Sequence, residues 1–272
     1  PAISSQSPYV VVLAVDILIA VLFATSLHFI MGPAGMHSFG HAAYFGLGAY
    51  GAAIVLKATG APMLAVLVAA PLVAAAGAVV VGWFSVRLSG VYLAMLTLAF
   101  AQIAWAIVYQ WDAFTGGSNG LTGVWPPEWL ADKRAYYALT LALVLAGVFV
   151  LRRILHAPFG YAMRAARDSV LRADAIGIDV KRVQWVAFVI AGLFAGLAGA
   201  TASEVETELT ERIEKKLQET PYVDVLKSAS RAGESLVFVL LKDYTPKAEV
   251  PEAWRQVRKK LDDIRHTLPA GV

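Results

Sequence analysis

The chain has 272 residues, of which 58% are apolar and only 16% are charged. Soluble domains carry about 25% charged residues, so this composition argues against a simple soluble enzyme. The absence of cysteine excludes disulfides, thiolate zinc sites and a cysteine nucleophile. The net charge of +3 does not indicate nucleic-acid binding, because the basic excess lies in the apolar part of the chain, where membrane orientation explains it better.

Charge is distributed unevenly along the chain. Residues 1–200 hold 18 charged side chains, whereas the much shorter stretch 201–272 holds 25. We therefore expect two parts, a transmembrane domain over residues 1–200 and a soluble segment over residues 201–272, which join near Thr201.

Long charge-free intervals in the first part predict membrane-spanning helices, since a span needs about 20 mainly apolar residues. The predicted fold is mainly α, a polytopic bundle of about six apolar segments. They are expected near Tyr9–Met31, His37–Leu56, Pro62–Phe84, Val91–Gln110, Ala135–Leu155 and Val183–Thr201.

The second segment is short and follows a stretch that contains Gly32, Pro33 and Gly35. Gly and Pro that interrupt an apolar stretch are typical of broken helices at transporter substrate sites. Two interpretations are open: a half-spanning broken helix, or two ordinary spans joined by a tight turn.

Loop charges predict the orientation. Seven basic and three acidic residues lie between Arg152 and Arg182, and Arg87 falls on the same side. By the positive-inside rule the 152–182 loop is cytoplasmic. Residues 111–134, and the segment 201–272, are then expected on the outer side.

Polar residues within the apolar part are the candidates for a functional role. His37 and His41 are four apart, so they are expected on one helix face, but no carboxylate or thiolate completes a metal set. We expect Ser38 and His41 either to form hydrogen bonds between helices or to line a polar path. The external loop that contains Ser118, Asn119 and Thr122 is a second candidate for contact with a substrate or partner, or a plain connection.

Two glycine patterns indicate packing. Gly46-x-Gly48-x-x-Gly51 matches a dinucleotide motif, but it lies inside an apolar segment, without the preceding strand that such a site requires. Gly192, Gly196 and Gly199 form a small-residue stripe suited to close helix contact.

We expect no cofactor, no metal and no enzymatic activity, and the chain shows no energy source of its own.

Five stretches resemble the branched-chain amino acid ABC transporter permease family: Ser38–Tyr50, the Gly117–Gly123 loop, Ala157–Asp168, Arg172–Val180 and Ala187–Gly199. The resemblance covers about residues 9–200. It implies a multi-pass protein of the bacterial inner membrane, which would work with a sister permease, two cytoplasmic ATP-binding subunits and a periplasmic substrate-binding protein.

The resemblance also implies a coupling helix that docks into the ATPase, at Pro158–Ile178 in this chain. Its charged face would be Arg164, Arg167, Asp168 and Arg172, and Gly177 would form a cap or turn. The family continues with further spans after Gly199, so the permease part is expected to be truncated at its C-terminal side.

The segment 201–272 predicts a small α-β-β-α unit. An amphipathic helix from Ser203 to about Leu217 precedes two strands, Tyr222–Ser230 and Ser235–Lys242, and a second helix that begins at Pro251. Thr210–Leu217, Pro221–Gly233 and Glu252–Pro269 resemble the periplasmic porter subdomain of resistance-nodulation-division efflux transporters.

Three hypotheses follow. The first is a branched-chain amino acid permease subunit driven by partner ATPases. The second is a fragment of a proton-driven multidrug efflux transporter, against which the near absence of intramembrane acids counts. The third is a non-transporting chimera of the two.

Overall fold

The computed structural model describes residues 8–60, 62–117, 121, 133–202, 223–231, 234–241, 246 and 249–264. The expected helix at 203–217 lies outside these residues.

Among the described residues, six long helices form the main body of the fold. They are α1 (Pro8–Met31), α2 (His41–Thr59), α3 (Met63–Ser85), α4 (Gly90–Gln110), α6 (Lys133–Leu155) and α9 (Val180–Ala202). Five of them, all except α2, are long and apolar enough to cross a membrane. The prediction of a mainly helical, polytopic fold is therefore confirmed.

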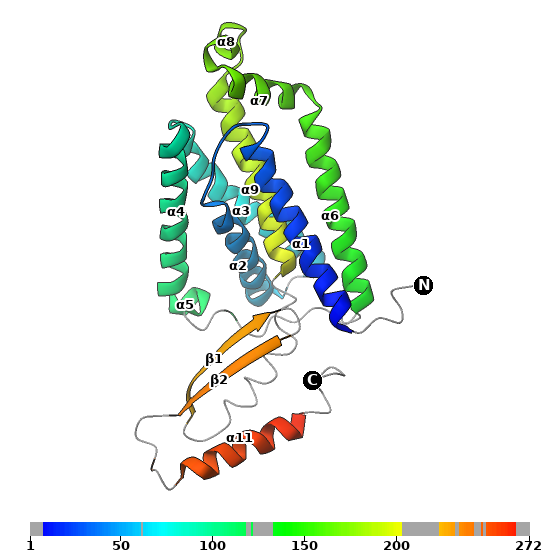
Figure 1. The fold of residues 1–272 in the computed structure, drawn as a ribbon, viewed down its shortest axis with the longest axis vertical. Helices are drawn as coiled ribbons and strands as arrows, with labels where there is room; N and C mark the ends of the chain where they lie inside the picture. The colour runs from blue at the N-terminus through cyan, green and yellow to red at the C-terminus, as the bar shows by residue number, and fades with distance from the viewer. Residues whose placement is uncertain are drawn as a thin grey trace.

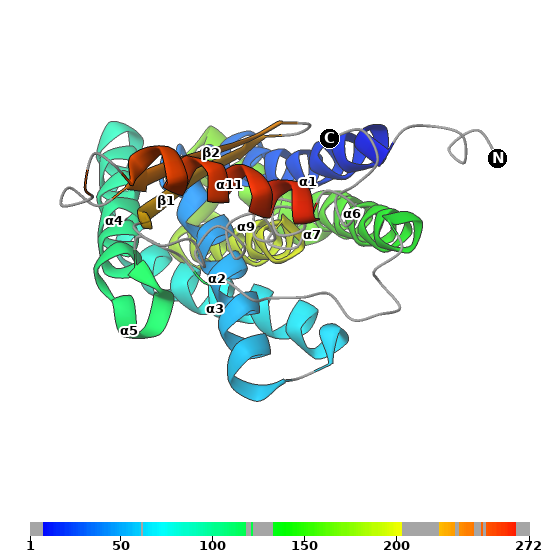
Figure 2. The same ribbon diagram turned by 90° about the horizontal axis from the view of Figure 1, so that it is seen from below.

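The long helices run up and down along one direction, so that successive connections alternate between the two ends of the bundle (Figure 1). Viewed from below, α9 lies at the centre, with α1 and α6 on one side and α2 and α3 on the other, while α4 stands at the edge (Figure 2). Outward-facing side chains of α3 and α4 are large and apolar, as a lipid-facing surface requires; examples are Leu64, Val68, Leu72, Val91 and Met95.

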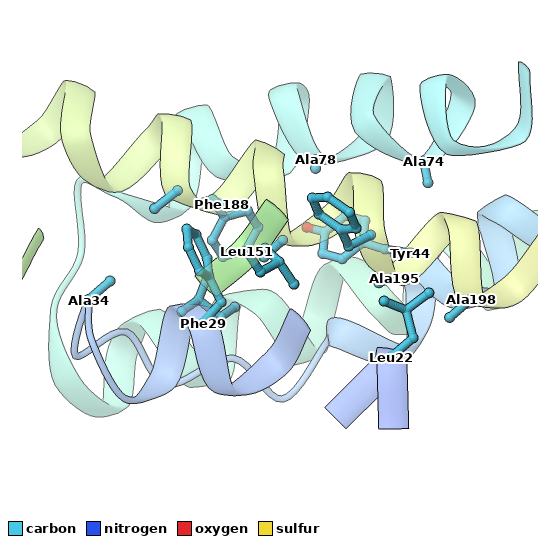
Figure 3. Packing of buried hydrophobic residues seen from close by; sticks show 14 of the residues in the cluster. Leu22, Phe29, Ala34, Tyr44, Ala74, Ala78, Leu151, Phe188, Ala195 and Ala198 are labelled. Carbon is cyan, nitrogen blue, oxygen red and sulfur yellow. The ribbon is translucent and has the colours of Figure 1, made fainter. Parts of the chain in front are cut away.

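Small residues let the central helices approach closely. Ala74 and Ala78 of α3 face the α9 residues Ala191, Ala195 and Ala198, and all five are buried. The larger core side chains fill the space on the α1 side, where Phe29 of α1 packs near Phe188 of α9 and Leu151 of α6, and Leu22 of α1 lies near Ala195 and Ala198 of α9 (Figure 3). Such small-residue contacts are the usual means of close helix packing in membranes.

The glycines of α2 and α9 lie at the same interfaces. A Cβ at Gly48 would overlap the backbone of Gly196, and one at Gly199 would overlap the carbonyl group of Phe45. A Cβ at Gly192 would meet Ala78, 2.5 Å away. Gly48 and Gly196 are therefore the points where α2 and α9 come together, and the Gly46–Gly51 pattern lies within a helix that packs on other helices.

Three short helices lie at the ends of the bundle. At one end, α7 (Pro158–Asp168) and α8 (Val170–Ala175) connect α6 to α9, and α5 (Asp112–Thr115) follows α4 at the other (Figure 1). Proline at the first position of α7 fixes a helical φ where no backbone donor is needed.

After α9, the described residues form a hairpin and one helix. Strands β1 (Val223–Arg231) and β2 (Glu234–Leu241) pair antiparallel, with Arg231 opposite Glu234. Helix α11 (Val250–Ile264) is amphipathic and buries Ala253 and Val257. These elements follow α9 at the end of the bundle opposite α7 and α8 (Figure 1).

Candidate functional site

The connection between α1 and α2 is an interruption of helical structure inside the bundle. Residues 32–40 are non-helical, and they lead back from the end of α1 to a start of α2 part-way along the bundle (Figure 1). Ala34, Met36 and Ser38 are almost fully buried. The N–H of Met36 donates to the carbonyl oxygen of Ile30 at 3.0 Å. Irregular backbone at membrane depth needs such protein partners, because lipid offers none.

This geometry corrects two expectations. α2 begins at His41 and not at His37, so the two histidines do not share a helix face and no paired-ligand arrangement exists. The connection is also longer than a tight turn, because Gly32, Pro33 and Gly35 end α1, and Gly40 is the residue that precedes α2.

His41 joins α2 to α1 through Ser26. Its Nε2 lies 2.9 Å from Oγ of Ser26, and that hydroxyl donates to the carbonyl oxygen of Phe23 at 2.7 Å. A hydroxyl has one hydrogen to donate, so the Nε2–H of the imidazole must be the donor to Ser26. The lone pair is then on Nδ1, which makes Nδ1 an acceptor.

Two buried polar atoms at this interruption lack hydrogen-bond partners within the described part of the chain: Nδ1 of His41 and Oγ of Ser38. Both residues are 3% exposed. Buried polar atoms in proteins are nearly always paired, so these two atoms keep an unused capacity to bond a water molecule or a ligand's polar group. Ser38 and His41, singled out in the sequence, thus belong to the same buried polar region.

Aromatic rings surround His41. The ring of Phe23 lies 5.3 Å from the imidazole centroid and that of Tyr44 lies 5.8 Å away. Tyr44 in turn contacts Phe188 edge-on at 5.7 Å. The unpaired Nδ1 therefore lies in a predominantly apolar environment.

Thr97 of α4 holds the start of α2 from the other side. Its Oγ1 accepts the N–H of Phe39 at 3.2 Å and donates to the carbonyl oxygen of Ala94 at 2.8 Å. Any side chain at Gly40 would collide with the backbone of Thr97, so glycine is required there. The Phe39 side chain remains 63% exposed.

The sequence did not single out Ser26 and Thr97 as candidate functional residues. Each hydroxyl also bonds a carbonyl of its own helix, which is what any serine or threonine in an apolar helix does, so no sequence signal distinguishes them. The remaining candidates of the substrate path, Ser118, Asn119 and Thr122, lie outside the described residues; of the same loop, Gly116 and Gly117 adopt positive φ.

The second candidate region is the corner formed by α7 and α8. α7 buries Gly160, Met163 and Ala166 against the bundle. Arg164 turns back to the end of α6, where its Nη2 donates to the carbonyl oxygen of Leu155 at 2.9 Å. A cation at that position compensates the unpaired carbonyls of a helix C-terminus.

Arg167 and Asp168 form an ion pair at the end of α7, with Nη2 2.9 Å from Oδ1. Arg167 also donates from Nη1 to the carbonyl oxygen of Gly32, at 3.0 Å. Arg172 is exposed on α8, which ends at Ala175, and Gly177 just beyond the helix has φ of +85°. The N–H of Gly177 donates to Asp174 and that of Ile178 to Ala173, the bond pattern of a glycine-terminated helix.

Large apolar side chains are exposed on the same corner. Tyr161, Val170, Leu171 and Ile176 are all more than half exposed, and Leu171 reaches 84%. Arg164, Arg167 and Arg172 belong to the same two helices, and the guanidinium of Arg164 lies 5.3 Å from the Tyr161 ring centroid. A corner that combines exposed apolar side chains with positive charge has the character of a protein-binding surface.

Comparison with known proteins identifies the family. Residues 9–204 match the model of the branched-chain amino acid transport system / permease component family. Two curated relatives are the high-affinity branched-chain amino acid transport system permease proteins LivM of Escherichia coli and of Salmonella typhimurium. Each is 27% identical over 209 residues, which cover 67% of this chain and 49% of the relative.

A third relative is the guanosine ABC transporter permease protein NupQ of Bacillus subtilis, 35% identical over 78 residues, or 28% of this chain and 24% of the relative. No solved structure matches the chain. The chain spans about half the length of the LivM proteins. With a family match over most of its length and five helices able to cross a membrane, the chain is a multi-pass membrane protein that belongs to the branched-chain amino acid transport system permease family.

Proposed function

We propose that the chain is the membrane-spanning permease subunit of an ABC importer for branched-chain amino acids, itself non-enzymatic and driven by separate cytoplasmic ATPases. The observation that carries this proposal is the family match over residues 9–204. The fold adds a polar interruption inside the bundle and an exposed basic corner outside it, and a subunit that passes substrate and receives force from a partner needs both.

The charge distribution supports one orientation in the bacterial inner membrane. The α3–α4 turn, with Arg87, lies at the same end of the bundle as α7 and α8 (Figure 1). The loop 152–182, with seven basic residues, is cytoplasmic in this proposal, since positive loops remain inside. The C-terminal end of α9 then reaches the outer side, and residues 201–272 are periplasmic.

The substrate path is proposed to pass the interruption between α1 and α2. The Nδ1 acceptor of His41 suits an ammonium group or a water bound to it, and the hydroxyl of Ser38 can donate to a carboxylate. The rings of Phe23 and Tyr44 suit an aliphatic side chain. Ser118, Asn119 and Thr122 are proposed to contribute from the outer loop.

The α7–α8 corner is proposed to dock into the ATP-binding subunits. The apolar contact area comes from the exposed side chains of Tyr161, Val170, Leu171 and Ile176. The charged face is formed by Arg164, Arg167, Asp168 and Arg172, and the turn after α8 is formed at Gly177. The remaining partners would be a sister permease, membrane lipid and a periplasmic substrate-binding protein; nucleic acid is not among them.

We propose the domain division at residue 200, with a permease domain over 1–200 and a porter-like α+β segment over 201–272. The hairpin β1–β2 and helix α11 support the second part. The resemblance to an efflux porter leaves two alternatives to be tested, an efflux fragment and a non-transporting chimera.

Reconstitution in proteoliposomes tests the function. The chain is combined with its sister permease, the ATP-binding subunits and the binding protein, and uptake of labelled leucine, isoleucine, valine and guanosine is compared with and without ATP. ATP-dependent uptake of the three amino acids supports the proposal. Uptake of guanosine alone contradicts the substrate assignment, proton-driven export supports the efflux alternative, and no transport supports the chimera.

A matched pair of variants tests the path. Ser38→Ala removes a buried hydroxyl that has no partner among the described residues, and Ser85→Ala removes another such hydroxyl at the end of α3. If Ser38 donates to the substrate, its loss raises KM by about two- to tenfold, the worth of one hydrogen bond, while Ser85→Ala transports normally. Equal KM values for the two variants would remove Ser38 from the path.

A further inference from the structure

Arg167 faces the bundle and contacts the α1–α2 connection. Its Nη1 donates to the carbonyl oxygen of Gly32, 135 positions earlier in the chain, at 3.0 Å. Gly35 lies against the stem of the same side chain: a Cβ at Gly35 would come within 2.5 Å of Cγ and 3.2 Å of Cδ of Arg167. One side chain of α7 thus holds the non-helical segment at two points.

Asp168 fixes the direction of this contact. Its Oδ1 accepts a hydrogen bond from Nε of Arg167 at 2.9 Å and lies 2.9 Å from Nη2 in the ion pair, while Nη1 donates to Gly32. The planar guanidinium is suited to such simultaneous bonds in a fixed geometry. The two side chains are 43% and 60% exposed, and exposed ion pairs contribute little to stability. A role in stability alone therefore explains this arrangement poorly.

The segment that Arg167 holds leads directly to the polar region. Five residues separate Gly35 from His41, and within them lie Ser38 and the Phe39 N–H that bonds Thr97. These residues are packed in the bundle, since Met36 and Ser38 are buried, and packed side chains are what carries a displacement from one site to another. A shift at Gly35 therefore reaches the start of α2 over only a few residues of chain. Arg164, by contrast, bonds Leu155 and holds α7 to α6.

We propose that Arg167 is a positioning residue that transmits movement of α7 to the polar segment, and through it to Ser38 and His41. When a partner ATPase displaces α7, Arg167 pulls on Gly32 and Gly35 and changes the path at the start of α2. This inference rests on the proposed function, and it gives Arg167 a role inside the subunit that differs from contact with the ATPase.

The first test measures coupling in the complete reconstituted complex. Arg167→Ala is compared with Arg182→Ala, which removes another loop arginine that is 84% exposed and paired with an acid, Asp179. In the described part of the chain, the Arg182 side chain makes no hydrogen bond to residues 32–40. We expect Arg167→Ala to assemble and hydrolyse ATP, with amino acid uptake per ATP lowered by about fivefold or more. Arg182→Ala should behave as the parent protein.

Arg167→Lys separates charge from geometry, because an ammonium group retains the charge but not the fork that binds Asp168 and Gly32 together. Low uptake per ATP in both Arg167 variants supports the proposal. Unchanged uptake per ATP in Arg167→Ala overturns it. Loss of ATPase binding in Arg167→Ala, with normal coupling in Arg167→Lys, also overturns it, since Arg167 would then act as a docking charge.

The second test does not depend on transport. Amide hydrogen exchange is measured on the full chain in lipid nanodiscs, where loss of the contact should raise exchange at residues 32–36 in Arg167→Ala and not in Arg182→Ala. Unchanged exchange overturns the inference even if the complex transports amino acids. If exchange rises in Arg167→Ala but the parent complex shows no uptake, the contact of Arg167 with residues 32–36 is supported and the proposed function is contradicted.

Discussion

Replacing Gly48 with alanine should weaken the contact between α2 and α9. A Cβ at this position would lie 2.5 Å from Cα of Gly196 and 2.6 Å from its carbonyl carbon. Carbon atoms in ordinary contact are about 3.5–4.0 Å apart. Both neighbours are backbone atoms that cannot rotate away, so the two helices must separate by about 1 Å.

The expected cost follows from that separation. A gap of about 1 Å forfeits up to half of the dispersion energy of the contacts it opens, and overpacking a tight site costs about 1–3 kcal/mol. Alanine recovers up to about 1 kcal/mol, because it forms helix better than glycine. Because this Cβ would lie closer still to the carbonyl oxygen of Gly196, the cost falls in the upper part of that range, about 2–3 kcal/mol. After the gain of about 1 kcal/mol, the net effect of Gly48→Ala is a destabilisation of about 1–2 kcal/mol.

Gly46 supplies the matched control, since it lies in the same helix and nothing lies within 4 Å of its Cβ position. Gly46→Ala should be neutral or stabilising by up to about 1 kcal/mol. The assay heats purified protein in detergent and measures the folded fraction by gel filtration. Gly48→Ala should unfold several degrees below the parent, at about 2–4 °C per kcal/mol. Equal unfolding temperatures for the two variants would refute the packing argument.

Three further variants test individual contacts. Ser26→Ala leaves the Nε2–H of His41 without its partner and should lower stability by about 1–3 kcal/mol, measured in the same heating assay; no loss would mean that the bond at 2.9 Å is dispensable. Arg164→Ala removes the bond to the Leu155 carbonyl, so limited proteolysis should cut the α6–α7 corner faster; an unchanged rate contradicts the capping role. Gly177→Ala places a side chain at φ of +85° and should cost about 1–2 kcal/mol, seen as a lower unfolding temperature, whereas an unchanged temperature would show that the turn does not need glycine.

The long helices could be predicted because their signal is local. An apolar stretch such as Pro62–Phe84 must form a helix to satisfy its own backbone in lipid, and the observed α3 (Met63–Ser85) differs by one residue at each end. α7 was likewise expected within 158–178, but its separation from α8 at Ser169 was not. There the backbone becomes extended and the Ser169 side chain caps α8.

The interruption between α1 and α2 was only half predictable. Gly32, Pro33 and Gly35 signal a helix end, but the start of α2 at His41 depends on the bonds of Phe39 to Thr97 and of His41 to Ser26. These bonds join residues 58 and 15 positions apart. The contact of Arg167 with Gly32 spans 135 positions. Tertiary contacts of this kind leave no periodicity or motif in a single sequence.

Cysteine labelling tests the central claim most directly, because the chain has no cysteine of its own. Single cysteines replace Leu171, 84% exposed on α8, and Phe114, 51% exposed on α5 at the opposite end. With a membrane-impermeant maleimide on cells whose inner membrane is intact, Phe114→Cys should label at once and Leu171→Cys only after permeabilisation. Labelling of Leu171→Cys in intact cells, with Phe114→Cys protected, would contradict the orientation on which the proposed transport mechanism depends.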